Sequence, residues 1–349
     1  MKSLKLPMLV LAGLLGASAL AQPGPDPQQT RAALLPYASA ADAVTLPDGR
    51  QLAFVCMGEG SPTVILTAGG ANTAFSSWSL VQPAMARTTR VCAWDRPGWG
   101  LSDGSAAPQN SGTTTADLEA ALATGKIPGP YVLVGWSLGS YESLLFADRH
   151  PDQAVGMVLV DPSIPDQVAI IQRVAPALLP QTAQQDQMLN ILRTCAAQIR
   201  SGALRLGGPD PGNCVAYPST WPEELRQALA AKVIGNPLQY ESQVSMMTSL
   251  PESSRIVIHP QRNYGDMPLI VLTATVSQPA PPGATAEEVA ARAAWEEEWN
   301  RGHDALASLS SRGINARVPG ANHGIQNSKP QVVIDAVEAV VAEARAAGS

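Results

Sequence analysis

The segment 135–139, Gly-Trp-Ser-Leu-Gly, contains a serine in a setting that favours nucleophilic chemistry. It lies between a short apolar run at 131–134 and a segment with helical spacing that extends to residue 149. A G-x-S-x-G pattern between a strand and a helix forms a tight turn that exposes the serine hydroxyl, and its glycines avoid collisions with the adjacent strand and helix. The pattern therefore predicts that Ser137 is a nucleophile and that the backbone N–H of Leu138 stabilises a developing oxyanion.

Two other glycine-containing motifs stand before this segment. Residues 68–70, Ala-Gly-Gly, follow an apolar run at 63–67. Residues 95–102, Asp-Arg-Pro-Gly-Trp-Gly-Leu-Ser, follow a strand-like run at 90–94. In order and spacing, the three motifs resemble the oxyanion loop, the D-x-x-G-x-G-x-S loop and the nucleophile turn of the α/β-hydrolase superfamily. The resemblance covers about residues 44–345.

The resemblance implies an α/β-hydrolase fold. In this fold a mostly parallel, twisted, eight-stranded sheet carries helices on both faces, and a helical cap is inserted after strand 6. The amide that follows the glycine of the oxyanion loop donates to the substrate, which assigns the second oxyanion donor to Gly70, with Ala71 as the alternative. Ala68 stands where the family has histidine, and this difference matters little for a backbone donor. Asp95 and Arg96 are expected to hold their own loop by hydrogen bonds.

The family order of nucleophile, acid and histidine places the general base after the last strand. Of the four histidines, only His323 directly follows the last predicted strand, 314–318. His150 ends the helix after the nucleophile, His259 lies in the expected cap, and His303 lies on a charged helical segment. His323 is therefore expected to accept the serine proton and pass it to the leaving group.

The acid that orients His323 is expected at the end of a strand. In the commonest family arrangement it follows the strand predicted here at 268–273, but no carboxylate comes after that strand until Glu287. Asp161 ends the preceding predicted strand, and some family members carry their acid there. We therefore predict Asp161 as the acid, with Asp166 and Glu287 as the alternatives.

Alternating strands and helices must position these residues. Several runs are short and continuously apolar, as expected for parallel strands that are covered on both faces. They are residues 63–67, 131–134, 155–160 and 268–273.

Two long segments interrupt the alternation. Residues 163 to about 262 contain helical stretches near 186–199 and 222–234, and they are predicted to form the cap over the active site. Residues 278–309 begin as a proline-rich loop and continue from residue 286 as a charged helix, which is expected to pack outside the sheet.

The N-terminus has the pattern of an export signal. Two lysines precede an apolar run at 6–20, and residues 19–21, Ala-Leu-Ala, fit the cleavage rule, so 1–21 is predicted to be a signal peptide. The run is too short and too rich in glycine for a comfortable membrane span. Residues 22–43 are expected to be a flexible leader, and 44–349 the hydrolase domain. The mature protein is expected to be periplasmic or secreted, without stable membrane insertion.

The chain has four cysteines, and an even number behind an export signal suggests two disulfides. In the superfamily, the strand that corresponds to the one holding Cys56 runs antiparallel beside the strand that corresponds to the one holding Cys92. The resemblance therefore implies a Cys56–Cys92 bridge, which leaves Cys195 to pair with Cys214 inside the cap.

Composition excludes several other functions. The formal net charge of −6 argues against nucleic acid as a partner, and no basic run suggests anionic lipid. Neither a dinucleotide fingerprint nor metal-ligand spacing is found, so no cofactor or metal is expected. The predicted function is hydrolysis of a small-molecule carboxylic ester through an acyl-enzyme on Ser137. The alternatives are an acyltransferase, an amidase or iminopeptidase, and a ligand-binding protein without turnover.

Overall fold

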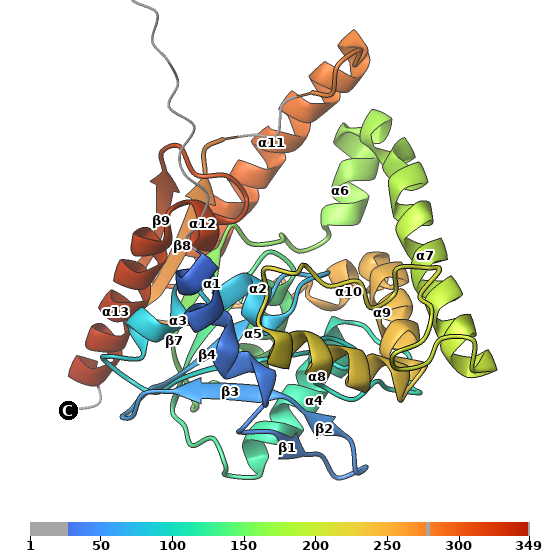
Figure 1. The fold of residues 1–349 in the computed structure, drawn as a ribbon. Coiled ribbons are helices and arrows are strands. Elements are labelled where there is room, and N and C mark those ends of the chain that lie inside the picture. The colour runs from blue at the N-terminus through green and yellow to red at the C-terminus, as the bar shows by residue number, and fades with distance from the viewer. Residues whose placement is uncertain (1–26, 277–279, 348–349) are drawn as a thin grey trace, which may run out of the picture.

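The computed structural model describes residues 27–276 and 280–347, in which a large sheet is flanked by helices (Figure 1). The sheet order is β3-β5-β4-β6-β7-β8-β9. β3 runs antiparallel to β5 and all other neighbouring pairs are parallel, so the prediction of a mostly parallel sheet is confirmed. The strands are β3 (Phe54–Met57), β4 (Thr63–Thr67), β5 (Val91–Trp94), β6 (Tyr131–Trp136), β7 (Ala154–Val160), β8 (Leu269–Ala274) and β9 (Gly313–Val318).

Within the described residues this sheet has seven strands, so the prediction of eight is wrong. The strand expected to hold Cys56 is interrupted at Ala53, whose N–H donates to Ser102 Oγ (2.8 Å) and whose carbonyl accepts from the N–H of Asp95 (3.0 Å). Because these backbone groups bond to a loop, β2 (Gln51–Leu52) pairs with β1 (Val44–Thr45) in a separate antiparallel pair. Only β3 continues into the large sheet.

Strand β4 illustrates how the sheet builds a core on both faces. Val64 and Leu66 belong to one hydrophobic cluster, whereas Ile65 belongs to another. Successive side chains of a strand point to opposite faces, so a continuously apolar run indicates a sheet that is buried on both sides.

The helices of the main domain divide between these two clusters. The first cluster contains side chains from α2 (Ala74–Trp78), α3 (Gln82–Met85), α12 (Ile325–Ser328) and α13 (Pro330–Ala347). The second contains side chains from α4 (Ser111–Ala123), α5 (Gly139–Arg149) and α11 (Ala286–Ala307). The helix predicted from residue 286 is therefore present and packs against the sheet.

The cap lies between β7 and β8 and has its own small hydrophobic cluster. It follows the fifth of seven strands along the chain rather than the sixth of eight, since the large sheet has one strand fewer than predicted. Both helices predicted inside it are present, as α7 and α8. Its helices are α6 (Gln167–Val174), the 3-10 helix η2 (Pro176–Gln181), α7 (Thr182–Ser201), α8 (Glu223–Ile234), α9 (Leu238–Thr248) and α10 (Leu250–Ile256).

Part of the expected leader is helical. Residues 27–38 form α1 (Pro27–Leu34) and the 3-10 helix η1 (Leu35–Ala38). Tyr37 is buried in the first cluster together with Leu225 and Leu229 of α8, and Arg31 forms an ion pair with Glu224 at 2.8 Å. The predicted signal peptide lies outside the described residues.

Two disulfides join the pairs that the family resemblance implied. Cys56 and Cys92 are register partners in the antiparallel β3–β5 pair and are bonded, and Cys195 is bonded to Cys214 within the cap. Two disulfides are compatible with an exported protein. Among residues 27–276 and 280–347, no helix is both long and apolar enough to cross a membrane.

Candidate active site

Ser137 occupies a strained turn between β6 and α5. Its φ of 51° lies in the left-handed region, which is unusual for a residue with a side chain. The turn is held by backbone bonds from Ser137 N–H to the carbonyl of Val160 (3.1 Å) and from Ser163 N–H to the carbonyl of Ser137 (3.0 Å). A Cβ on Gly135 would lie 2.5 Å from the Gly139 carbonyl oxygen, so the strand and the helix approach too closely there for any side chain. The sequence motif thus forms the turn that it predicted.

Three polar side chains meet at one edge of the sheet. His323 Nε2 lies 3.0 Å from Ser137 Oγ, and His323 Nδ1 lies 2.7 Å from Asp161 Oδ2. These residues follow β6, β7 and β9, and the carboxyl ends of parallel strands share one edge. The Asp161 side chain is 5% exposed and the His323 side chain 40% exposed, so the imidazole bridges a buried carboxylate and an accessible hydroxyl.

The neighbouring strand and a tryptophan fix the orientation of this group. Asp161 Oδ1 accepts a hydrogen bond from the backbone N–H of Ala274 at 2.9 Å, which leaves Oδ2 to face the imidazole. Trp136 Nε1 donates to the carbonyl of His323 at 2.8 Å, and the two rings are 5.5 Å apart. These bonds orient the Asp161 carboxylate and hold the backbone of His323 in place.

The two alternative acids lie elsewhere. Asp166 is the N-cap residue of α6, and Glu287 is exposed in the first turn of α11. The structure brings Asp161, and neither of these carboxylates, to His323.

The two predicted oxyanion donors lie on adjacent loops. A Cβ on Gly70 would be 3.1 Å from the Leu138 side chain, so these residues are direct neighbours. In the part of the chain that the structure describes, neither the Gly70 nor the Leu138 N–H donates to a protein acceptor. Two unpaired N–H groups near a nucleophile are the arrangement that stabilises a tetrahedral oxyanion.

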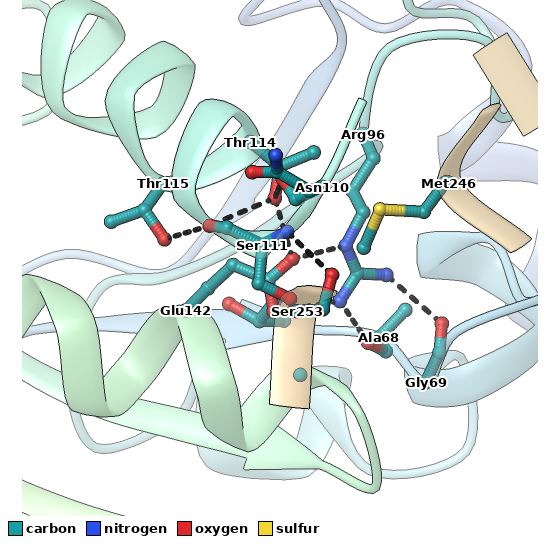
Figure 2. Close-up of polar contacts among 12 residues, drawn as sticks. Ala68, Gly69, Arg96, Asn110, Ser111, Thr114, Thr115, Glu142, Met246 and Ser253 are labelled. Atoms are coloured by element: carbon teal, nitrogen blue, oxygen red, sulfur yellow. Dashed lines mark hydrogen bonds and ion pairs between the residues drawn. The ribbon is translucent and has the colours of Figure 1, made fainter. Parts of the chain in front are cut away.

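The carbonyl of Arg96 holds its own loop, since it accepts from the N–H of Trp99 at 2.9 Å, but its side chain reaches the oxyanion loop (Figure 2). Its guanidinium donates to the carbonyls of Gly69 (2.9 Å) and Ala68 (2.8 Å), and it binds the carboxylate of Glu142 through contacts of 2.5 and 3.1 Å. Asp95 does hold the loop, since it accepts from the N–H of Leu101 at 3.4 Å.

Sequence reasoning missed Glu142. Its side chain is 0% exposed and accepts from the Thr114 hydroxyl at 2.9 Å as well as from Arg96. A glutamate in the first turn of the helical segment that follows the serine, with no other charged residue before Asp148, was the available signal, since such a carboxylate is rarely buried without a partner.

A second buried polar group lies against the residue that follows Asp161. His303 is fully buried, and its Nε2 lies 2.8 Å from the carbonyl of Pro162, the residue after Asp161. Its Nδ1 lies 2.7 Å from Thr273 Oγ1. The Trp299 ring lies near both imidazoles, with its centroid 4.9 Å from that of His303 and 6.2 Å from that of His323. Burial lowers the pKa of His303 to about 4, despite the nearby negative charge of Asp161. A neutral His303 with its proton on Nε2 satisfies the Pro162 carbonyl.

The low pKa of His303 predicts an acid-sensitive fold. His303 is protonated near pH 6.5 in the unfolded chain but only near pH 4 in the folded chain. The contribution of neutral His303 to the stability of the fold is therefore complete above pH 6.5 and is lost as the pH falls toward 4. The loss corresponds to roughly 3 kcal/mol. In urea unfolding between pH 7.5 and 4.5, the free energy of unfolding of His303→Gln should fall less than that of the parent protein by about this amount.

The parent protein must be compared with His303→Gln because the titration of Asp95 changes the free energy of unfolding in the opposite direction. Burial raises the pKa of Asp95 to about 6, so its titration favours the folded state at low pH, equally in both proteins. His259→Gln, at a half-exposed position, is the matched control. Equal pH dependence in the parent and in His303→Gln would contradict the assignment.

A cavity of about 380 Å³ begins at Ala71, the residue after Gly70, and is shared with the cap. Phe75 and Trp221 line it and pack edge to face, with ring centroids 5.0 Å apart. None of its lining residues is charged. Gln239 also lines it and is fully buried, and its side-chain amide has no hydrogen-bond partner among the described residues. The cavity suits the uncharged part of a small molecule.

Comparison with known proteins places the chain in a family. The model of the alpha/beta hydrolase family matches residues 64–336, and the chain belongs to this family. An uncharacterized protein of Schizosaccharomyces pombe is 44% identical over 81 residues, which are 23% of this chain but 15% of the relative, so the chain spans only a small part of that protein.

Two solved structures share the fold over nearly their whole length. A candidate lipase from Acinetobacter baumannii superposes with a TM-score of 0.59 at 16% identity, covering 92% of this chain and 97% of the other. A thermophilic esterase from Thermogutta terrifontis gives a TM-score of 0.53 at 18% identity, covering 86% and 98%. The chain is therefore a hydrolase-family protein with the α/β-hydrolase fold.

Proposed function

We propose that the protein is a serine hydrolase that cleaves carboxylic esters through an acyl-enzyme on Ser137. The observation that carries the proposal is the hydrogen-bonded chain from Asp161 through His323 to Ser137, with contacts of 2.7 and 3.0 Å. This is the geometry in which an imidazole activates a hydroxyl while a carboxylate orients the imidazole.

In the proposed reaction, Ser137 Oγ attacks the ester carbonyl while His323 Nε2 takes its proton. Asp161 accepts the hydrogen bond from Nδ1–H and stabilises the imidazolium that forms. The amides of Gly70 and Leu138 bind the oxyanion of the tetrahedral intermediate. His323 then protonates the departing alkoxide. Water, deprotonated by the same imidazole, releases the acid and restores the serine.

Two features favour an uncharged ester as the substrate. The cavity beside Gly70 has aromatic walls and no charged lining residue, so it would accept an apolar group without leaving an ionic group unpaired. The similarity to proteins described as a candidate lipase and an esterase points to the same class of bond.

The proposal predicts stoichiometric labelling of one serine. The purified protein should react with a fluorophosphonate probe at a single site, and peptide mapping should place the adduct on Ser137. It should hydrolyse p-nitrophenyl acetate and butyrate and turn over the corresponding p-nitroanilides much more slowly. Faster turnover of the anilides would favour an amidase. A folded protein that neither reacts with the probe nor cleaves these esters would contradict the proposal.

A further inference from the structure

We propose that Arg96 is a positioning residue for the oxyanion hole, and that its ion pair with Glu142 sets the spacing between the two oxyanion donors. The inference rests on the proposed function, because it concerns the Gly70 and Leu138 amides. Arg96 acts through the backbone of the oxyanion loop and is not expected to touch the substrate (Figure 2).

The first step concerns the peptide unit that carries the Gly70 donor. The carbonyl of Gly69 and the N–H of Gly70 belong to the same planar group, and in a trans peptide they point in opposite directions. Arg96 Nη1 donates to this carbonyl at 2.9 Å. A contact that fixes the direction of the carbonyl therefore also fixes the direction of the Gly70 N–H, which points away from the guanidinium.

The second contact prevents the loop from rotating. Arg96 Nη2 donates to the preceding carbonyl, that of Ala68, at 2.8 Å. Two bonds from one rigid planar group to consecutive carbonyls define the orientation of both peptide units, which a single point donor would not do. The positive charge also polarises the Gly69–Gly70 peptide and strengthens its N–H as a donor.

The third step concerns Glu142. It lies in the first turn of α5, the helix whose N-cap residue is Leu138, the other proposed donor. The carboxylate holds the guanidinium through two contacts, and both side chains are buried, at 2% and 0% exposure. One ion pair thus connects the loop that carries the first donor to the helix that carries the second.

The structure contains a second buried arginine–carboxylate ion pair that does not contact the oxyanion loop. Arg262, with a 3% exposed side chain, binds Asp148 through contacts of 2.9 and 2.6 Å. Asp148 lies near the other end of α5, and none of the contacts of Arg262 in the described residues reaches residues 68–70. A purely structural role predicts that the two ion pairs respond alike to substitution.

The test compares Arg96→Met with Arg262→Met. Both variants should lose thermal stability, but only Arg96→Met should lower kcat for p-nitrophenyl butyrate, by about 10²- to 10³-fold, with KM changed little, because an oxyanion donor acts in the transition state. Affinity for phenylboronic acid, whose tetrahedral serine adduct presents an oxygen to the same donors, should fall in proportion to kcat/KM.

Lysine variants provide the same comparison if the methionine variants do not fold. Arg96→Lys keeps the charge beside Glu142 but offers no planar fork, so kcat should fall at least tenfold relative to Arg262→Lys at unchanged KM. Equal kcat in the matched variants, or a loss of boronic acid affinity that does not follow kcat/KM, would overturn the inference. Turnover and labelling of the parent protein, in which both arginines are present, report on the proposed function separately.

Discussion

Replacement of Ser137 by alanine is expected to lower kcat for ester hydrolysis by about 10⁶-fold, the scale seen when a serine hydrolase loses its nucleophile. The substitution removes the hydroxyl oxygen that lies 3.0 Å from His323 Nε2 and that would carry the acyl group. The imidazole and the oxyanion donors remain, so any residual rate would reflect attack by water. Initial rates with p-nitrophenyl butyrate, together with loss of fluorophosphonate labelling, measure this effect.

The fold should survive this change, because the turn is held by backbone bonds rather than by the hydroxyl. Ser143→Ala is the matched control, since it removes a buried hydroxyl on α5 that donates to the Gly139 carbonyl at 3.1 Å and, among the described residues, makes no bond to Ser137, Asp161 or His323. Activity in Ser143→Ala should stay within a few-fold of the parent. A Ser137→Ala protein that retains a tenth of the parent rate would rule out the acyl-enzyme.

Asp161→Asn is expected to lower kcat about 10⁴-fold through the tautomer of His323. The N–H of Ala274 donates to Oδ1 at 2.9 Å, so an asparagine must keep its carbonyl oxygen there and turn its NH₂ group toward His323 Nδ1. That NH₂ group donates, so Nδ1 must accept and the proton moves to Nε2, which faces Ser137. The imidazole can then no longer take the serine proton.

The matched controls are Asp166→Asn and Glu287→Gln, which alter the two alternative acids. Both should retain activity within a few-fold, because neither side chain reaches His323. Steady-state kinetics on the three variants, with circular dichroism to confirm folding, decide between the candidates. If Glu287→Gln loses activity while Asp161→Asn keeps it, the acid has been assigned to the wrong strand.

Much of the site was predictable from sequence because its members follow apolar strands. A parallel sheet brings the carboxyl ends of its strands to one edge, so residues that directly follow strands converge even when they are far apart in the chain. Ser137 also needed the G-x-S-x-G motif, and Asp161 and His323 needed the family resemblance. The resemblance likewise gave the disulfide pairs, because it places the strand of Cys56 beside that of Cys92 and leaves Cys195 for Cys214.

The parts that sequence reasoning missed depend on contacts between elements. Glu142, the partner of Arg96, lies 46 positions away on a helix, and the local sequence does not predict which turn of that helix faces the guanidinium. The break at Ala53 has a similar origin, since its backbone bonds to the loop at Ser102 instead of to a strand. The burial of His303 likewise depends on how α11 packs over β8, which the charged composition of that helix did not indicate.

The helix at the start of the described chain has a consequence for the order in which the molecule assembles. Arg31 and Glu224 are separated by 193 positions, and Tyr37 shares a hydrophobic cluster with Leu225 and Leu229. Closing so long a loop is slow in comparison with forming local contacts. Tyr37 can meet Phe75 and Gln82, its other partners, as soon as these residues have been made, but its contacts with α8 must wait until residues 223–234 have been made. Residues 27–38 thus make their contacts with the cap late, although they precede it by almost two hundred positions.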